Sequence, residues 1–512
     1  MKFLGDILRR NAQVLAGKPA VVQGSTRLSY SLVNKRANSL AHGLLEMGIK
    51  KGDRVALLSR NDYRFLEIYF GLPKIGAIFV PLSFWATADD LALIIKQCQA
   101  SVLVVSPDFL DTAEAIRPRL PALRHLILLG DHAPAGMVPY EHLARDFPVD
   151  EPEADLEPDD DILILYTSGS TGKPKGAVYA HHALLYTAMV MSIELGLRET
   201  DVTLHFLPLF SSNLEHLLPL SLVGATHVIL DKFDPSAAWQ TVEREQVTYF
   251  DAVPTIMRLL QCPMLSQCDT SSLRLVCYAS EPMPPATITA WLAALPHVEA
   301  VQFYGMIEFL CITVLKPWEQ LSRLGTVGKP MLGTDLRLVN EEGQDVAVGT
   351  VGEVVARSAC PMRGYWQSPD STSKAGQDGW MRTGDLGRLD EDGYLTLVGR
   401  KKEIIKSGGM TVAPAEVEEV LYRHPAVAEA VVVGRADATW GEAVHAVVAL
   451  KPEAKATAEE LIRFCANHLA GYKKPRSVEF LPSLPKTGIG KIARKLLQDR
   501  IWTTGDASQE VT

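Results

Sequence analysis

The chain has 512 residues and a formal net charge of -9, and this length exceeds what one compact core usually accommodates, so we expect two or more domains. Its 47% hydrophobic and 22% charged residues are ordinary for a globular enzyme. The acidic balance argues against a general nucleic-acid-binding protein, whose electrostatic surface would be basic.

Cysteine usage and hydropathy narrow the class of protein further. The seven cysteines are odd in number and show no Cys-x-x-Cys spacing, which argues against a disulfide framework or a zinc site. Asp6 and Arg9-Arg10 precede any long apolar run, so we predict no secretory signal. No uninterrupted apolar stretch reaches the roughly 18 residues of a membrane span. We therefore expect a cytoplasmic protein without a transmembrane segment.

The first predicted elements alternate between helix and strand. Residues 28–47 show the spacing of a capped amphipathic helix, with apolar side chains at Leu32, Ala37, Leu40, Leu44 and Leu45. A second helix is predicted over residues 65–74. Short apolar strands are predicted over residues 54–58, 78–81, 101–105 and 125–129. This alternation favours a parallel or mixed β-sheet.

An acidic connector and a glycine-rich loop come next. Residues 150–161 are rich in Asp, Glu and Pro, and we interpret them as a solvated surface segment rather than a metal cluster. The apolar strand 162–165 leads directly into Tyr-Thr-Ser-Gly-Ser-Thr-Gly-Lys-Pro-Lys-Gly at residues 166–176. Its glycines, Gly169, Gly172 and Gly176, allow tight turns that aim backbone N–H groups inward.

This loop has the composition of a polyphosphate-binding site. Its hydroxyl and cationic side chains are Thr167, Ser168, Ser170, Thr171, Lys173 and Lys175. Each charge-assisted contact with a phosphate would contribute about 1.5–3 kcal/mol. Pro174 after Gly172-Lys173 breaks the Walker pattern, and no Gly-x-Ser-x-Gly hydrolase elbow is present. A flexible surface loop is the remaining alternative, which the flanking apolar strands disfavour.

At this loop the sequence resembles the adenylate-forming (AMP-binding) enzyme superfamily, which includes acyl- and aryl-CoA ligases, luciferases and peptide-synthetase adenylation domains. The loop matches the family signature almost letter for letter, and further matches continue in family order to Lys491. The resemblance therefore covers nearly the whole chain. It implies that the segment from Thr167 through Gly169 to Lys175 binds ATP.

The next matching segments would bind the carboxylic acid. Pro208-Leu209-Phe210 resembles the start of the motif beside the acyl pocket, and Ser211 stands where the family often has His. Residues 249–254 resemble the strand end that walls this pocket, so Asp251 and Val253 would line it. We interpret two lone histidines in this part of the chain as structural residues, His216 and His227.

Two further segments resemble the adenine and magnesium sites of the family. Ser280, Glu281 and Pro282 match a loop that lies along the adenine. The resemblance of residues 302–308 implies that the nucleotide is bound by Gln302, Tyr304 and Gly305, with the Tyr304 ring stacked on the base.

The end of that motif carries the predicted metal ligand. Glu308 offers the hard oxygen that Mg²⁺ prefers. Ile307 replaces a family Thr, which removes one hydrogen bond to the α-phosphate, at a cost of about 1 kcal/mol. We expect the acyl group to lie against Ile307 instead.

The C-terminal motifs complete the predicted nucleotide site. Asp385 resembles the residue that binds both ribose hydroxyls, and a carboxylate can accept two hydrogen bonds at once. Arg400 would lie near the ribose, and Lys402 matches the pivot of an interdomain hinge. Lys491 is implied as the catalytic lysine between the substrate carboxylate and the α-phosphate. Lys486 is either a second contributor or a solvated lysine.

A tunnel for a thiol is predicted after the hinge. Lys406, Gly408 and Gly409 would line it, since the two glycines leave a bare backbone that a slender pantetheine arm can approach. Helical spacing over residues 416–421 and apolar strands over 431–433 and 445–450 predict a small α+β domain.

These matches predict an α/β protein with a large N-terminal α/β domain, in which helices sandwich mixed sheets, over residues 1–397. A hinge would follow over 398–402, and a small mobile α+β domain over 403–512. The expected enzyme is AMP-forming and uses ATP, Mg²⁺ and coenzyme A. A fatty or aromatic carboxylate would attack the α-phosphate, and a thiol would then displace AMP after the C-terminal domain rotates.

Three alternatives for the function stay open. CoA is the expected thiol, because residues 440–442 and 472–475 resemble segments of CoA ligases and no carrier domain follows Lys491. The second alternative is a stand-alone adenylating enzyme that loads the phosphopantetheine of an acyl carrier protein. The third is a non-enzymatic nucleotide-binding or scaffold protein, which the departures at Ser211 and Ile307 make conceivable.

Overall fold

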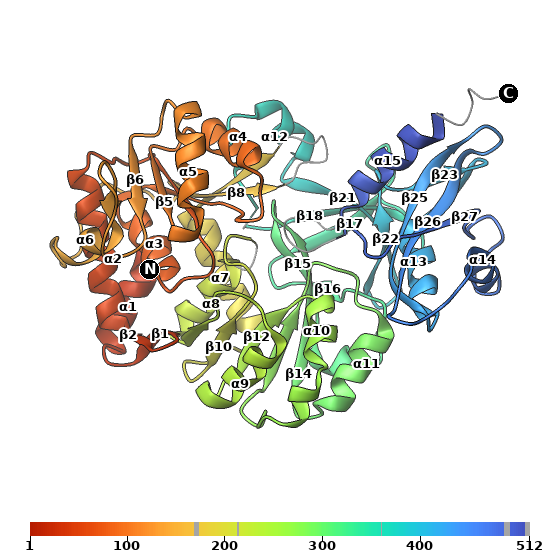
Figure 1. Cartoon of the computed structure of the whole chain (residues 1–512), viewed down its shortest axis with the longest axis horizontal. Helices are drawn as coiled ribbons and strands as arrows, with labels where there is room; N and C mark the ends of the chain where they lie inside the picture. The colour runs from red at the N-terminus through yellow and green to blue at the C-terminus, as the bar shows by residue number, and fades with distance from the viewer. Residues whose placement is uncertain (168–173, 212–213, 360, 486–491, 507–512) are drawn as a thin grey trace. The chain divides into compact units, whose positions relative to one another are not determined.

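A computed structural model describes residues 1–167, 174–211, 214–359, 361–485 and 492–506 (Figure 1). The described residues form helices and four β-sheets, which we name A to D. The chain divides into two compact units, residues 1–336 with 356–381 and residues 337–355 with 382–512. This mixed architecture confirms the predicted fold class, whereas the hinge at 398–402 stays a prediction. No helix in the described ranges combines the length and hydrophobicity needed to cross a membrane.

Sheet A is the larger sheet of the first unit. Across the described residues its nine strands follow the order β16-β15-β14-β13-β12-β10-β11-β1-β2. The strands from β14 to β1 in this order pair in parallel, and β2, β15 and β16 pair antiparallel. Their bounds are β1 Pro19–Gln23, β2 Thr26–Ser29, β10 Val202–His205, β11 Thr226–Ile229, β12 Tyr249–Ala252, β13 Leu275–Tyr278, β14 Glu299–Met306, β15 Leu310–Leu315 and β16 Lys329–Pro330.

Helices cover both faces of sheet A. On one face, Trp239, Met257 and Trp291 pack against Phe250. These side chains come from α9 (Pro235–Glu245), α10 (Pro254–Leu260) and α11 (Pro285–Ala294). On the other face, Met191 and Leu220 pack against Tyr249, Leu275 and Cys277. They belong to α7 (His181–Glu194) and α8 (Leu214–Val223).

Sheet B is built on the strands that sequence spacing predicted. Its order in the described chain is β19-β9-β8-β4-β3-β5-β6-β7. The strands are β3 Arg54–Leu58, β4 Ile78–Pro81, β5 Val102–Val105, β6 His125–Leu128, β7 Val138–Pro139, β8 Asp161–Thr167, β9 Lys175–Ala180 and β19 Gly364–Tyr365. The inner strands pair in parallel and are buried along their length. Such continuous apolar runs are typical of parallel sheets that are covered on both faces.

The helix predicted over residues 28–47 is α2 (Tyr30–Glu46), and Ser29 caps it by accepting a hydrogen bond from the backbone N–H of Leu32. Ala37, Leu40 and Leu44 are buried as predicted. Leu32 is 42% exposed and Leu45 is 38% exposed, so the predicted apolar stripe was too wide. Part of the buried face is polar instead, because Arg36 pairs with Glu67 and Glu141 of the neighbouring helices.

The other helices of the first unit are short. They are α1 Gly5–Val14, α3 Arg64–Gly71, α4 Ala88–Cys98, α5 Leu110–Ile116, α6 Tyr140–Arg145 and α12 Pro369–Ala375. The described residues of this unit also contain five 3₁₀ turns, η1 Leu72–Ile75, η2 Pro107–Phe109, η3 Arg117–Arg119, η4 Pro263–Ser266 and η5 Pro317–Glu319.

The acidic connector 150–161 is only partly solvated. Glu151 forms an ion pair of 2.7 Å with Lys74, whose side chain is buried. Lys74 also donates hydrogen bonds to Asn34 and Asn38 of α2. Burial lowers the pKa of the Lys74 ammonium, while the nearby Glu151 raises it. The interpretation of this segment as a solvated linker was therefore wrong for Glu151, which anchors it to α2.

Sheets C and D lie in the C-terminal part of the sequence. Sheet C has the order β17-β18-β21-β20, with β22 beside β21, and sheet D has the order β24-β23-β26-β25, with β27 beside β26. Their strands are β17 Asp335–Val339, β18 Gly352–Arg357, β20 Gly376–Gln377, β21 Trp380–Leu389, β22 Leu395–Arg400, β23 Ile405–Ser407, β24 Met410–Val412, β25 Val427–Asp437, β26 Gly441–Leu450 and β27 Ser477–Phe480.

Helices pack on sheet D around a core of valines and leucines. Val417 and Leu421 contact Val432, Val444 and Val448 in this core. The helices of this region are α13 Pro414–Arg423, α14 Ala458–Ala466 and α15 Arg494–Asp506. The predicted helix 416–421 and strands 431–433 and 445–450 lie inside α13, β25 and β26, which confirms the small α+β domain.

Candidate active site

Nine of the predicted acid and nucleotide residues lie where the parallel strands of sheet A end. Strands β10, β12, β13 and β14 run in the same direction, so their carboxyl ends share one edge. The residues at or just after these ends are Phe210, Ser211, Asp251, Val253, Ser280, Glu281, Pro282, Tyr304 and Gly305. Open α/β sheets bind ligands at this edge. The topology therefore brings together four motifs that are far apart in the sequence.

The glycine-rich loop joins the antiparallel strands β8 and β9 of sheet B. Thr167 pairs with Lys175 at the base of the hairpin. A Cβ atom on Gly176 would lie 2.5 Å from the Cγ2 of Ile164, so only glycine fits there without displacing the strand. The predicted phosphate-binding residues Ser168, Gly169, Ser170 and Thr171 lie outside the described residues.

Glu308 and Lys175 meet on the side chain of Tyr365. The Tyr365 hydroxyl donates a hydrogen bond of 2.6 Å to Glu308 Oε1. The Lys175 ammonium lies 5.0 Å from the centre of the Tyr365 ring, within cation–π range. Burial raises the pKa of the Tyr365 phenol, and the charge of Glu308 raises it further. The phenol therefore stays protonated and acts as a donor at neutral pH.

Backbone contacts join sheet B to the turn that carries Glu308. The Met362 N–H donates to the Glu308 carbonyl over 2.9 Å. The Tyr179 hydroxyl of β9 donates to the Ile307 carbonyl. Tyr365 itself pairs with Ala177 of β9. These contacts hold Ile307 and Glu308 beside the base of the predicted phosphate-binding loop, although Ile307 lacks the hydroxyl of the family Thr.

The turn after β14 depends on Gly305. A Cβ atom there would lie 1.7 Å from the Leu310 carbonyl oxygen, and Leu310 itself adopts a φ of 65°. Tyr304, the preceding residue, is 8% exposed. The close approach of the two strands at Gly305 therefore sets the position of the Tyr304 ring.

Two predicted nucleotide residues are held by protein partners. Glu281 Oε2 accepts hydrogen bonds from the Thr255 N–H at 3.3 Å and the Thr255 hydroxyl at 2.9 Å. Gln302 is 5% exposed and accepts from the Tyr278 hydroxyl at 3.2 Å. Both residues support the strand ends, and their contacts with a nucleotide stay predictions.

In the second unit, the structure brings Asp385 and Arg400 together. They are register partners on β21 and β22, and Arg400 Nε lies 3.1 Å from Asp385 Oδ1. The Asp385 side chain is 11% exposed and that of Arg400 is 65% exposed. Lys402 lies in the turn that follows β22. Their roles at the ribose and hinge stay predictions.

Gly408 and Gly409 form a two-residue turn between β23 and β24. Their φ angles are 59° and 78°, and Ser407 pairs with Met410 across the turn. Positive φ at both central positions is the requirement of a type I′ hairpin. A Cβ atom on Gly408 would lie 2.5 Å from the Trp440 ring, whereas one on Gly409 meets no atom within 4 Å. Only Gly409 therefore leaves open space beside its backbone.

The segment 440–442, which resembles a segment of CoA ligases, contacts this turn. The Gly408 N–H donates to the Trp440 carbonyl over 2.8 Å. The Lys406 N–H donates to Glu442 Oε2 over 2.6 Å. The predicted tunnel residues and the segment 440–442 thus form one local structure.

Lys486 and Lys491 lie outside the described residues, but the chain on either side of them is well anchored. The Ala493 N–H donates to the Pro485 carbonyl over 2.7 Å. Arg494, the first residue of α15, pairs with Glu418 of α13 at 2.7 Å. Both ends of the lysine-bearing segment are therefore tied to the small α+β domain.

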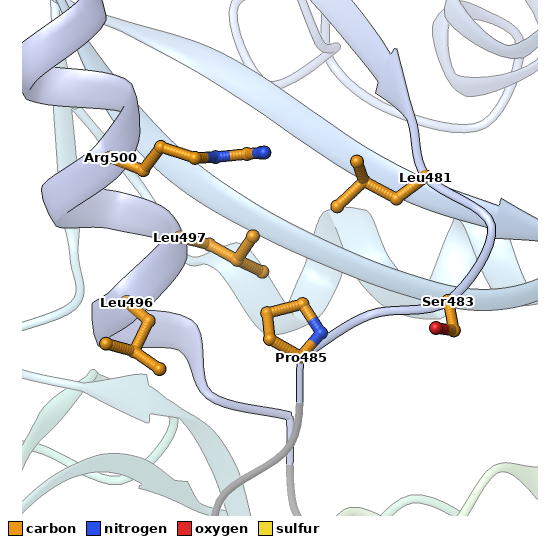
Figure 2. Close-up of a pocket in the computed structure, with 6 residues that line it drawn as sticks. All are labelled: Leu481, Ser483, Pro485, Leu496, Leu497 and Arg500. Atoms are coloured by element: carbon orange, nitrogen blue, oxygen red, sulfur yellow. The ribbon is translucent and has the colours of Figure 1, made fainter.

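Two surface cavities lie apart from the predicted site residues. Figure 2 shows one of them, where side chains of α15 face the segment after β27, lined by Leu481, Ser483, Pro485, Leu496, Leu497 and Arg500. Its volume is about 340 Å³. The other, of about 470 Å³, lies near the amino ends of β3, β5 and β6 and is lined mainly by polar side chains, including Lys50, Asp53, Arg54 and Arg124. Neither is lined by a residue of the predicted site.

Tyr365, Tyr179 and the backbone of Met362 were not predicted as site residues. Tyr365 lies 57 positions after Glu308, in a strand of two residues. Neither residue spacing nor side-chain chemistry links these positions before the sheets are assembled. Sequence motifs identified Glu308 and Lys175 as candidate ligand-binding residues and missed the residues that hold them.

The fold and the convergent strand ends define a two-unit α/β protein with its candidate site at carboxyl strand ends. The model of the AMP-binding enzyme family matches residues 8–366, and that of the AMP-binding enzyme C-terminal domain matches residues 416–491. The chain belongs to the AMP-binding enzyme family.

Several characterised proteins are similar along almost the whole chain. A feruloyl-CoA synthase from Amycolatopsis sp is 36% identical over 96% of this chain and 97% of its own. A fatty acid–[acyl-carrier-protein] ligase, ScoC, from Streptomyces coeruleorubidus is 33% identical over 96% and 95%. The crystal structure of the anthranilate CoA ligase AuaEII with anthranoyl-AMP has a TM-score of 0.92 at 33% identity and covers 98% of each chain.

Proposed function

We propose that this protein is an ATP-dependent, AMP-forming acid–CoA ligase, which activates an organic carboxylate as an acyl-AMP and transfers the acyl group to CoA. The observation that carries the proposal is the convergence of Lys175, Tyr365 and Glu308 beside the carboxyl ends of sheet A. The similar feruloyl-CoA synthase and anthranilate CoA ligase support the same chemistry.

The first half-reaction joins the acid to the nucleotide. A carboxylate oxygen attacks the α-phosphorus of ATP, the bond to the β-phosphate oxygen breaks, and pyrophosphate leaves. Lys175 and the loop from Thr167 would hold the leaving pyrophosphate by charge-assisted hydrogen bonds. Lys491 would balance the charge of the carboxylate and the α-phosphate.

Glu308 fits the predicted magnesium site. Its Oε1 is oriented by the Tyr365 hydroxyl at 2.6 Å, and a single carboxylate beside nucleotide phosphates is a common ligand arrangement for Mg²⁺. Bound there, the ion would neutralise phosphate charge. Tyr365 keeps the carboxylate in one orientation, and Lys175 on the other side of the ring contributes a second positive charge.

The second half-reaction transfers the acyl group. The thiol sulfur attacks the carbonyl carbon of the acyl-AMP, the thiol proton is lost, and the carbon–oxygen bond to AMP breaks. The open space beside Gly409 is where the pantetheine arm would approach. Rotation about Lys402 would exchange Lys491 for the Gly408-Gly409 turn between the two half-reactions.

A carrier protein is the second candidate for the acceptor. ScoC, which loads an acyl carrier protein by name, is about as similar to this chain as the CoA ligases. CoA remains the first candidate, because the similar feruloyl-CoA synthase and anthranilate CoA ligase are named as CoA-dependent enzymes. A cytoplasmic location stays a prediction.

Two assays test the proposal. Exchange of labelled pyrophosphate into ATP, measured with a panel of fatty and aromatic acids, should require one of these acids. Release of AMP should then depend on CoA without any carrier protein. If none of the acids in the panel supports pyrophosphate exchange, the adenylation step is refuted. If AMP release requires a carrier protein, the second candidate is favoured.

A further inference from the structure

A buried polar cluster lies on the face of sheet A that α7 and α8 cover. Asp251 of β12 and Cys277 of β13 are register partners, and His216 comes from α8. All three side chains are buried, and their polar atoms lie within 4.8 Å of one another. Tyr249 lies two residues before Asp251 on β12 and therefore points to the same face.

Within the described residues, the hydrogen bonds to the Asp251 carboxylate all end on Oδ1. The Tyr249 hydroxyl donates to Oδ1, and His216 Nδ1 lies 2.8 Å from the same atom. An ionised carboxylate only accepts, so His216 carries a proton on Nδ1. Burial raises the pKa of the Tyr249 phenol well above its ordinary value, and the charge of Asp251 adds to this. Both partners are therefore donors to Oδ1.

The second oxygen of Asp251 has no such donor. Among the parts of the chain that the structure describes, no hydrogen bond ends on Oδ2, although the side chain is only 8% exposed. Oδ2 is not among the fully buried side-chain atoms that lack a hydrogen-bond partner, so this oxygen keeps contact with solvent. A ligand that covers Oδ2 must supply a donor, because a carboxylate oxygen that is buried without one costs free energy.

The position of Asp251 points to the acid substrate as that donor. Asp251 is the penultimate residue of β12, at the carboxyl edge where the candidate site lies, and it precedes Val253 of the predicted acyl pocket by two residues. Phe210, from the same predicted pocket, contacts the rings of Phe84 at 5.1 Å and Trp85 at 5.5 Å, both edge to face. An aromatic wall of this kind suits an aryl ring.

Resting on the proposed function, we infer that Asp251 Oδ2 accepts a hydrogen bond from the substrate, and that the acid is an aryl acid bearing an N–H or O–H donor. Tyr249 and His216 are positioning residues, because they hold Oδ1 and leave Oδ2 for the substrate. An unsubstituted fatty acid would place methylene groups against Oδ2 and leave its hydrogen-bonding capacity unused.

The experiment compares matched pairs of acids in pyrophosphate exchange. The ortho, meta and para isomers of hydroxybenzoate and aminobenzoate are each paired with the corresponding methylbenzoate. The equivalent cinnamates are paired in the same way. Decanoate represents the fatty acids. For the preferred isomer, the wild-type enzyme should show a kcat/KM about 10- to 100-fold above that of the methyl analogue, as expected for a hydrogen bond to a charged group.

Two variants assign this preference to Asp251. Asp251→Asn should reduce the ratio to within about threefold, mainly by lowering kcat/KM for the donor-bearing acid. Thr203→Val is the matched control, since Thr203 lies on the same face of the sheet as the register partner of Tyr249. The buried Thr203 hydroxyl has no hydrogen-bond partner in the described structure, so this variant should keep the wild-type ratio.

The outcomes separate this inference from the proposed function. Equal kcat/KM for donor-bearing and methyl acids in the wild-type enzyme would overturn the inference, whatever the variants do. If decanoate is the only acid that supports pyrophosphate exchange, the inference is also overturned, but the proposed function stands. An unchanged ratio in folded Asp251→Asn would also overturn the inference. If none of the tested acids supports pyrophosphate exchange, the proposed function and the inference are both refuted.

Discussion

Tyr365 connects two residues that sequence motifs identified independently. Its hydroxyl orients Glu308 and its ring lies beneath the Lys175 ammonium. Since the phenol donates to one carboxylate oxygen, the other oxygen is left to face a cation. A single tyrosine thereby couples the predicted metal-binding carboxylate to the base of the predicted phosphate-binding loop.

Replacing Tyr365 with phenylalanine should weaken the dependence on magnesium. The ring beneath Lys175 remains, while Glu308 loses a charge-assisted hydrogen bond of about 1.5–3 kcal/mol. We expect the Mg²⁺ concentration for half-maximal acyl-AMP formation to rise about tenfold or more. The added thermal stabilisation by ATP with Mg²⁺, relative to ATP alone, should shrink as well.

Tyr179→Phe is the control for this change. It removes the hydroxyl that donates to the Ile307 carbonyl and leaves the Glu308 side chain with its partner. It should lower thermal stability without changing the Mg²⁺ requirement. The same Mg²⁺ requirement in Tyr365→Phe and wild type would disprove the positioning role of Tyr365.

Two buried histidines should make the protein sensitive to mild acid. His205 Nε2 and His227 Nδ1 lie 2.9 Å apart, and burial, with some mutual repulsion at His205, lowers the pKa of each to about 3. In the unfolded chain their pKa returns to about 6.5. Between about pH 3 and 6.5 the unfolded state binds more protons, so stability falls as pH falls, by up to about 1.4 kcal/mol per pH unit for each histidine.

Urea unfolding at pH 7.5, 6 and 5 measures this effect. The double variant His205→Gln with His227→Gln should show a shallower loss of stability below pH 6.5. His181, whose pKa burial lowers to about 4, should retain its share of the slope. His297→Gln, at an exposed position, is the control and should keep the wild-type slope. An equal slope in the double variant and wild type would refute the assignment.

At the scale of single elements, Gly305 shows how one residue determines a hairpin. The antiparallel strands β14 and β15 approach so closely that a Cβ atom would lie 1.7 Å from the Leu310 carbonyl oxygen. The neighbour is backbone and cannot rotate away. The strand ends that carry Tyr304 and Glu308 therefore require glycine at this position.

Gly305→Ala should destabilise the protein by about 3 kcal/mol or more, as expected when a core must shift to relieve overlap. Gly17→Ala is the control, because a Cβ atom there meets nothing within 4 Å, and it should stay within about 0.5 kcal/mol of wild type. Free energies of unfolding from urea titration give both values. Equal stability of the two variants would contradict the argument.

Elements with strong local patterns were predictable, and side-chain exposure was less so. Strands β3 and β4 begin and end where the apolar runs do, since a buried parallel strand needs only a continuous apolar run. The exposure of Leu32 and Leu45 depends instead on which neighbours cover α2, and spacing along the helix does not contain that information. The buried pair of Arg36 with Glu67 was missed for the same reason.

At the scale of the whole molecule, the candidate site combines segments that are far apart in the sequence, such as those of Lys175, Glu308 and Tyr365. Motif matches located the candidate ligand-binding groups, because a ligand would constrain the chemistry of those side chains directly. The partners that orient those groups, such as Tyr365 for Glu308 and His216 for Asp251, become visible only when strands are placed side by side. We interpreted His216 as a structural residue, and its contact with Asp251 identifies the side chain that it holds in place.

The two-unit organisation makes a prediction about the two half-reactions. If the C-terminal domain presents Lys491 for adenylation and the Gly408-Gly409 turn for thioester formation, the two segments should be needed at different steps. Lys491→Ala should abolish acyl-AMP formation, with a loss of about 100-fold or more, because it removes the charge opposite the α-phosphate. The same variant should still convert supplied acyl-AMP and CoA to the thioester.

Gly409→Leu should show the opposite pattern, since its side chain would fill the open space beside the turn. Gly393→Leu is its control, because Gly393 also has a positive φ and a Cβ atom there would meet no atom within 4 Å, so it tests backbone strain alone.

Lys495→Ala, at an exposed position of α15, is the control for Lys491→Ala. Each half-reaction is measured separately, by pyrophosphate exchange and by thioester formation from supplied acyl-AMP. Equal damage to both half-reactions in Lys491→Ala would rule out domain rotation, because a lysine that serves one conformation has no reason to affect the other.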